Sequence, residues 1–133
     1  MKVKEVAKIT GLSRRTLQYY DEIDLMRPSR SVLNYRLYTE EDLDRLWQIQ
    51  VYKEMGFQLS EIRRLLKVND EQRAWLLNKK LQHINVKISD LEREYNFIKK
   101  VRDNGIPERM AVAHCDSSKT YRELAKLLAE RID

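Results

Sequence analysis

The sequence is poor in residues that interrupt helices or cross-link chains. Among 133 residues it has three glycines, two prolines and one cysteine. The scarcity of glycine and proline predicts a mainly helical fold. The single cysteine excludes an intramolecular disulfide and is typical of a reducing compartment. No apolar run approaches membrane-spanning length, and residues 1–5 lack the apolar core of a signal peptide. We therefore expect a cytoplasmic protein, either one compact domain or a small domain with an appendage.

The sequence also lacks the motifs of an enzyme or a metal site. It has no glycine-rich phosphate loop, and a metal site generally needs three or four convergent ligands. His114 and Cys115 are neighbours, and adjacent residues seldom orient for proton transfer. We expect no catalytic activity, no metal and no cofactor. Cys115 remains open to two interpretations, a thiol sensor or an incidental residue of the tail.

Positive charge is concentrated near the amino terminus. The formal net charge is +5, and 35% of the residues are charged. Residues 1–36 contain eight basic and four acidic side chains, so most of the excess lies in the first quarter of the chain. A local positive field of this kind favours a polyanionic partner such as DNA.

Residues 12–21 carry most of the information about function. They follow a short amphipathic helix and a turn, and Ser13 fits the N-cap of a second helix. Leu17 and Tyr20 share one face of that helix. The other face carries Arg14, Arg15, Gln18 and Tyr19. This partition predicts the second helix of a helix-turn-helix, which can enter the major groove of DNA. The alternative is an amphipathic helix with a solvated basic face.

The helical period disappears between residues 26 and 38. Turn formers and an alternating pattern predict a small β-hairpin, or wing, with its tip at residues 31–34. Thr39 fits the N-cap of the next helix, which Gly56 ends. The expected inner face of that helix consists of Leu43, Leu46, Trp47 and Val51. A short helix is predicted over residues 60–67.

Beyond residue 70 the apolar residues follow a heptad pattern. Intervals of three and four alternate along Ala74, Leu77, Leu81, Ile84, Ile88, Leu91, Tyr95 and Ile98. This a/d seam predicts a coiled-coil helix over residues 70–103, roughly 50 Å long at 1.5 Å per residue. The short remainder of the chain offers little to cover the seam, so the pattern favours a homodimer. A single-chain helical hairpin is the alternative.

The carboxyl-terminal part, residues 104–133, is expected to be a short tail. It begins with a helix-stopping Gly105-Ile106-Pro107 and contains an amphipathic helix from Ser117 to Ile132. Aromatic residues near this tail could line a small-molecule effector site between protomers, or could simply pack together. Their positions are Trp75, Tyr95, Phe97 and Tyr121.

The order of the predicted elements and the residues of their motifs closely resemble those of the MerR family of bacterial transcription regulators. The resemblance covers residues 2–67 almost without interruption and the coiled coil more loosely. Its main segments are Val6-Ala7-Lys8-Ile9-Thr10-Gly11-Leu12-Ser13, Arg15-Thr16-Leu17-Gln18-Tyr19-Tyr20-Asp21-Glu22, Asn34-Tyr35-Arg36-Leu37-Tyr38, Glu41-Asp42-Leu43-Asp44-Arg45-Leu46 and Met55-Gly56-Phe57. Gln18 departs from the family, which usually carries arginine there.

The resemblance implies a winged helix-turn-helix DNA-binding head over residues 1–68 and a homodimer with antiparallel long helices. Each head would read half of a pseudo-palindromic promoter site in double-stranded DNA. An effector-driven change would distort the spacer DNA and realign the promoter elements for RNA polymerase. The rivals are an effector-independent architectural protein or repressor, and a protein-interaction module that uses the coiled coil.

Seven residues are candidates for DNA contact, each with an ordinary surface role as the alternative. Arg14 and Arg15 lead as base or phosphate contacts, and Gln18 reads adenine or holds a phosphate. Tyr19 is expected to bind a phosphate, whereas Tyr20 is expected in the core. The remaining candidates are Tyr35 and Arg36 on the wing and Arg63 in the 60–67 helix. The dimerisation candidates are Leu77, Leu81, Ile84, Ile88, Leu91, Tyr95 and Ile98.

Overall fold

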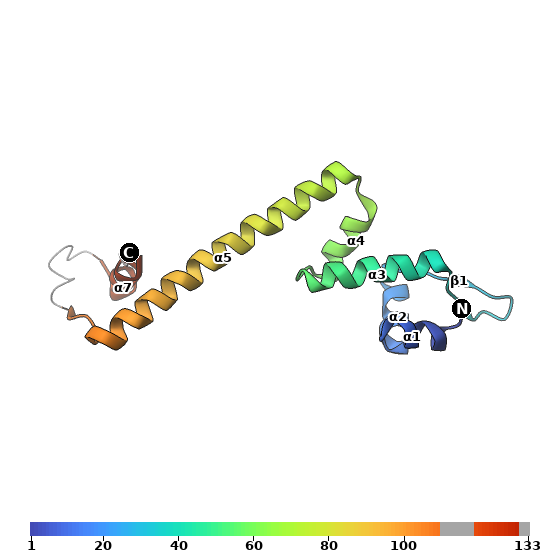
Figure 1. Ribbon diagram of the computed structural model, residues 1–133, viewed down its shortest axis with the longest axis horizontal. Helices are drawn as coiled ribbons and strands as arrows, with labels where there is room; N and C mark the ends of the chain where they lie inside the picture. The colour runs from blue at the N-terminus through green and yellow to red at the C-terminus, as the bar shows by residue number, and fades with distance from the viewer. Residues whose placement is uncertain (110–118, 131–133) are drawn as a thin grey trace. The chain divides into compact units, whose positions relative to one another are not determined.

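The computed structural model describes residues 1–109 and 119–130 and is mainly helical (Figure 1). The elements follow the order α1 (Val3–Thr10), α2 (Arg14–Glu22), β1 (Ser29–Arg30), β2 (Arg36–Leu37), α3 (Glu40–Glu54), α4 (Leu59–Lys67), α5 (Asp70–Asn104) and α7 (Tyr121–Glu130). The expected fold class, with a two-stranded wing and one long helix, is confirmed. The chain divides into two compact units, Met1–Arg73 and Ala74–Asp133, which are described separately. Within the described residues, no helix is long and apolar enough to cross a membrane.

Local signals in the sequence fix the ends of the helices in the first unit. Gly11 ends α1 with a φ of 75°, a left-handed conformation that favours glycine. Ser13 caps α2, because its hydroxyl accepts a hydrogen bond from the Thr16 N–H at 3.0 Å. Thr39 and Asp42 form a reciprocal capping box at the start of α3, with bonds of 2.9 and 3.1 Å. The turns between helices are thus specified residue by residue.

The core of the first unit joins all of its helices to the wing. Leu17 and Tyr20 on α2 are 1% and 2% exposed, as the sequence predicted. Apolar burial of this kind is the main term that stabilises the head. The other buried apolar side chains of this unit are Val6, Leu25, Met26, Tyr38, Leu46, Ile49, Phe57, Ile62 and Leu65.

One expectation about this core was wrong. Trp47, assigned to the inner face of α3, is 68% exposed, whereas Ile49 is 1% exposed. Successive residues of an α-helix are about 100° apart, so a stripe through Leu46 and Ile49 turns Trp47 away from the core. The large apolar side chain at position 47 had suggested burial that the geometry of α3 does not allow.

Arg73 anchors the start of α5 to the end of α4. Its guanidinium donates to the carbonyl oxygens of Leu65 at 3.1 Å and Val68 at 3.0 Å. It also pairs with Asp70 at 2.8 Å. These bonds satisfy carbonyl groups that the end of a helix leaves without intrahelical partners.

The second unit contains the rest of α5, which begins in the first unit, and the amphipathic helix α7. Every seam residue from Leu81 to Ile98 is between 37% and 69% exposed. Leu77 is half-buried, and Leu124 on α7 is 7% exposed. Ile88, Leu91, Tyr95 and Ile98 line one shallow concavity on α5, as members of a single helical face do.

The Tyr38 phenol is buried at the base of the wing. Its side chain is 2% exposed, and its hydroxyl has no hydrogen-bond partner among the described residues. Burial raises the pKa of Tyr38 above its ordinary value of 10.0, because the charged phenolate would lose its solvation. The folded state therefore holds this proton more tightly than the unfolded chain does.

Tyr38→Phe should leave the free energy of unfolding unchanged or raise it by about 1 kcal/mol, because an unpaired buried hydroxyl is removed. In the wild type, the contribution of the Tyr38 proton is fully present below about pH 10 and is lost as pH rises through the folded-state pKa. Denaturant titrations between neutral pH and pH 11 should show a smaller alkaline loss in Tyr38→Phe. The 62% exposed Tyr35 supplies the control Tyr35→Phe, which should behave as the wild type. An equal alkaline loss in Tyr38→Phe would contradict the role of this phenol.

Candidate nucleic-acid interface

The helix α2 separates a buried apolar face from an exposed polar one. Leu17 and Tyr20 point into the core, whereas Arg14, Arg15, Gln18 and Tyr19 are exposed. No protein partner of the Arg14 or Arg15 guanidinium is recorded among the described residues. Gln18 donates to the Glu22 carboxylate one turn away, at 3.2 Å. The exposed face thus offers two arginines, an amide and a phenol to a ligand outside the head.

Two concavities flank α2, and Gln18 lines both of them. The first lies between α2 and the wing, where Arg14 and Gln18 face residues of the hairpin. Its other polar lining residues are Lys2, Lys4, Arg30, Asn34, Tyr35 and Arg36. The second is lined by Arg15 and Tyr19 together with Lys53 and Leu59. Arg14 and Arg15, at the start of α2, therefore line concavities on different sides of the helix.

The wing is a short antiparallel hairpin closed by a tight turn. Ser29 pairs with Leu37, and Arg30 lies directly opposite Arg36. The Asn34 N–H donates to the Ser31 carbonyl at 2.9 Å. Asn34 has a φ of 66°, a left-handed conformation that asparagine tolerates better than most residues. The base of the hairpin is joined to the first residues of the chain, because Lys2 forms a bridge with Leu37.

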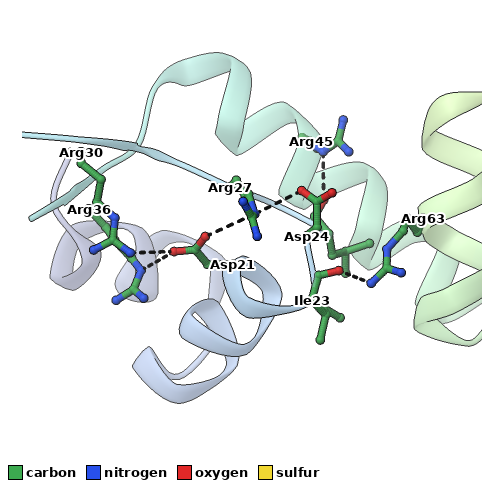
Figure 2. A network of polar contacts seen from close by, with 9 residues as sticks. Asp21, Ile23, Asp24, Arg27, Arg30, Arg36, Arg45 and Arg63 are labelled. Atoms are coloured by element: carbon green, nitrogen blue, oxygen red, sulfur yellow. Dashed lines mark hydrogen bonds and ion pairs between the residues drawn. The ribbon is translucent and has the colours of Figure 1, made fainter.

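Asp21, near the end of α2, holds the arginines of the wing (Figure 2). Its carboxylate accepts from Arg36 Nε at 2.8 Å and from Arg30 Nη2 at 3.2 Å. Arg27 Nε lies 4.0 Å from the same carboxylate and 3.2 Å from Asp24. The Asp21 side chain is 14% exposed, so solvent screens these interactions only in part. One carboxylate therefore fixes both strands of the wing relative to α2.

Two further arginines bind backbone carbonyls just after α2 (Figure 2). Arg45 on α3 donates to the Leu25 carbonyl at 3.1 Å. Arg63 on α4 donates through Nη2 to the Ile23 carbonyl. Both bonds clamp the segment that leads from α2 into the wing.

The candidate DNA contacts therefore fall into two groups. Arg14, Arg15, Gln18, Tyr19 and Tyr35 are exposed around α2 and the wing. Arg36 and Arg63 bind the Asp21 carboxylate and the Ile23 carbonyl, and their contact with DNA stays a prediction. These two bonds were not anticipated, because Asp21 and the Ile23 carbonyl are distant in sequence from the arginines that they bind. Neither pairing can therefore be recognised from a local pattern in the sequence.

Sequence reasoning did not single out several cations beside α2. Lys2, Lys4 and Arg30 line the concavity on the wing side, and Lys53 lines the other. Lys53 Nζ also lies 3.5 Å from the Tyr20 hydroxyl. The signal for the first three was the excess of basic residues in positions 1–36. Lys53 gave no such signal, because it comes from the far end of α3.

The part of the chain that the structure describes contains no group of three or more His, Cys, Asp or Glu side chains arranged to hold a metal ion. Cys115, left open as a thiol sensor or an incidental residue of the tail, lies outside the described residues together with its neighbour His114.

Comparison with known proteins identifies the family of this head. Residues 1–68 match the family model of the MerR helix-turn-helix regulatory proteins. The chain belongs to the MerR family. Residues 43–106 also match the model described as MerR, DNA binding. Together the two models span residues 1–106 of the chain.

Individual relatives agree with this assignment. The transcriptional activator mta of Bacillus subtilis is 41% identical over 99 residues, 68% of this chain and 38% of that protein. The mercuric resistance operon regulatory protein of Bacillus cereus is 31% identical over 121 residues, 86% of this chain and 91% of that protein. The crystal structure of the amino-terminal part of the Bacillus subtilis multidrug transporter activator is 38% identical, with a TM-score of 0.53. The match covers 71% of this chain and 97% of that structure. The chain therefore spans less than half of the full-length mta protein.

Asp21→Asn should lower the free energy of unfolding by about 2 kcal/mol, because it weakens charge-assisted hydrogen bonds to two arginines at a mostly buried site. Urea titration followed by circular dichroism measures the change. Asp44→Asn, at an exposed position of α3, is the matched control and should stay within about 0.5 kcal/mol of the wild type. Equal stability of Asp21→Asn and the wild type would show that the wing does not depend on this carboxylate.

Proposed function

We propose that this protein is a homodimeric, sequence-specific regulator that binds a pseudo-palindromic promoter site and distorts its spacer DNA. The observation that carries the proposal is the surface of α2. Its apolar face is buried, and its exposed face presents Arg14, Arg15, Gln18 and Tyr19 beside a basic wing. An α-helix fits the major groove, and arginine pairs bidentately with guanine. Lys2, Lys4 and Arg30 supply charge for the phosphates on the wing side.

The homodimer is supported by the uncovered seam of α5. Leu81, Ile88, Leu91, Tyr95 and Ile98 are all at least 47% exposed, and their a/d spacing is that of a coiled coil. An apolar stripe of this length is costly to leave in water. A second copy presents the same stripe, so a symmetric pair buries both.

Control by an effector completes the proposal. The carboxyl-terminal part, residues 104–133, follows the seam and includes the amphipathic helix α7. A small molecule bound there would shift the dimer between two arrangements that deform the DNA differently, with RNA polymerase responding at the promoter. Bending a site of this size costs several kcal/mol, an amount that ligand-dependent contacts can supply. The relative mta of Bacillus subtilis is a transcriptional activator, which supports an activating role.

Arg15→Ala should weaken binding to a DNA site selected from a random pool by about 1–3 kcal/mol. If Arg15 reads a base, the loss falls on that site and base preference relaxes at one position. If it holds a phosphate, all sequences lose affinity equally and the slope of log affinity against log salt falls by about one. Fluorescence anisotropy over a range of salt concentrations measures both quantities. Arg93→Ala on α5 removes the same charge far along the sequence and is the control. Unchanged affinity and slope in Arg15→Ala would remove this residue from the interface.

Ile88→Lys should split the dimer, because two lysines would be buried in an apolar seam without partners. Sedimentation velocity should then give a mass close to 16.0 kDa, and DNA affinity should fall because one head alone reads half of the site. Lys87→Ala changes the neighbouring position outside the seam and should keep the wild-type mass. An Ile88→Lys protein with the wild-type mass would contradict the assignment of the seam.

A further inference from the structure

The exposed apolar stripe of α5 has a definite centre. Its large side chains are exposed from Leu81 to Ile98, whereas Leu77, the seam residue before them, is half-buried. The midpoint of the exposed stripe lies between Ile88 and Leu91. A symmetric partner covers the whole stripe only when the centres of the two stripes coincide.

The residue types of the seam favour an antiparallel pair of helices. The interval of three residues that separates a from d places Leu81 at a and Ile84 at d. Parallel two-stranded coiled coils favour β-branched residues at a and leucine at d, a rule that Leu81, Ile84 and Ile98 all break. In an antiparallel pair, each layer joins an a residue to a d residue of the partner. Centred on the exposed stripe, the layers are Leu81 with the partner's Ile98, Ile84 with the partner's Tyr95 and Ile88 with the partner's Leu91.

Two side chains of opposite charge flank this seam on one side. Lys87 and Glu94 are exposed, and each directly precedes an a residue, Ile88 and Tyr95. Glu94 also borders the shallow concavity of the seam. The salt bridges of α5 recorded among the described residues involve other side chains, Arg73 with Asp70, Arg93 with Asp90 and Arg102 with Asp103. Lys87 and Glu94 are therefore placed to interact across the seam.

We propose that Lys87 pairs with the partner's Glu94, and that the two symmetric ion pairs fix the register of the dimer. This inference rests on the proposed function, because it takes the protein to be a homodimer. When antiparallel helices share the centre of the exposed stripe, Lys87 lies beside the partner's Glu94. Two-fold symmetry forms the same pair a second time on the other side of the centre. Charged residues beside an apolar seam set the choice and orientation of a coiled-coil partner.

A slip of one heptad toward the carboxyl end of α5 brings like charges together. Glu94 would lie beside the partner's Glu94, and Glu92 beside the partner's Glu92. Both contacts are repulsive, and the pairs of Lys87 are lost. The apolar seam alone does not prevent this slip, because a heptad repeat matches itself after every heptad.

A slip of one heptad in the opposite direction is disfavoured by charge and by fit. Lys87 would lie beside the partner's Lys87 at the centre of the dimer. Lys80 would gain the partner's Glu94, but the exposed Ile98 would face the small Ala74. Either slip moves one helix about 10 Å along the other, at 1.5 Å per residue. The two ion pairs therefore also set the distance between the ends of the two long helices.

The test is charge reversal in the full chain, with the dimer dissociation constant measured by sedimentation equilibrium at low salt. Lys87→Glu should raise the dissociation constant about tenfold, because two repulsive contacts replace two ion pairs. Glu94→Lys should have the same effect. The double variant Lys87→Glu, Glu94→Lys restores both pairs with reversed polarity and should return to the wild-type value. An equimolar mixture of the two single variants should form heterodimers. High salt should reduce all of these differences.

The double variant separates the proposed register from its rivals. In a parallel dimer, Lys87 lies beside the partner's Glu92 and Glu94 beside the partner's Lys99, so the double variant would dimerise no better than either single variant. Both slipped registers also predict no recovery. Lys100→Glu reverses a charge on the face of α5 away from the seam and should keep the wild-type dissociation constant. Circular dichroism should show equal helix content in every variant, because lysine and glutamate are both good helix formers.

The outcomes distinguish this inference from the proposed function. A wild-type chain that stays monomeric at every concentration contradicts the proposed homodimer. A wild-type dimer whose dissociation constant neither single variant changes would show that Lys87 and Glu94 do not meet. Weaker dimers of the single variants without recovery in the double variant would overturn the register.

Discussion

The arrangement of the proposed DNA-binding surface depends on the carboxylate of Asp21. Arg30 and Arg36 lie directly opposite each other on the two strands of the wing, and like charges in that position repel. Asp21 accepts a hydrogen bond from Arg30 at 3.2 Å and from Arg36 at 2.8 Å. The negative charge shared by the two arginines compensates their mutual repulsion. Because Asp21 belongs to α2, the same carboxylate also joins this helix to the wing. Two-residue strands are too short to hold the hairpin by their own pairing, so this contact adds to the bridge between Lys2 and Leu37.

This contact orders the wing without cancelling its charge. One carboxylate faces Arg30 and Arg36 at hydrogen-bond distance and Arg27 at 4.0 Å, so the cluster remains positive overall. A positive surface attracts DNA through its phosphates, whereas its orientation decides which phosphates are met. The Asp21 carboxylate slightly reduces the attraction to phosphates, but it fixes the orientation of the positively charged surface. Electrostatic attraction and geometric order are thus supplied by the same few residues.

Local sequence patterns predicted the helices and the wing, but they did not predict the intramolecular bonds of the arginines. The Ser13 cap, the burial of Leu17 and Tyr20 and the extent of the long helix followed from capping rules and periodicity. The bonds from Arg36 to Asp21 and from Arg63 to Ile23 join residues 15 and 40 positions apart, and no local rule anticipates such pairs. An arginine in a basic segment looks the same in sequence whether it faces DNA or a carbonyl group. The exposure of Trp47 was missed for a similar reason, because residue type alone suggested burial.

The arginines of the head therefore form two groups, one bound within the protein and one exposed, and only the geometry separates them. Arg45 and Arg63 bind the carbonyls of Leu25 and Ile23, which fixes the chain between α2 and the wing. Arg14 and Arg15 have no recorded protein partner among the described residues and lie on the face of α2 that leaves the core. Guanidinium groups that bind carbonyls lose part of their solvation during folding. The desolvation free energy of these groups therefore belongs to folding and not to DNA binding. Those that stay hydrated lose solvation only at the DNA surface, where counterion release compensates. In the proposed complex with DNA, this division allows arginine both to build the exposed surface of the head and to contact DNA.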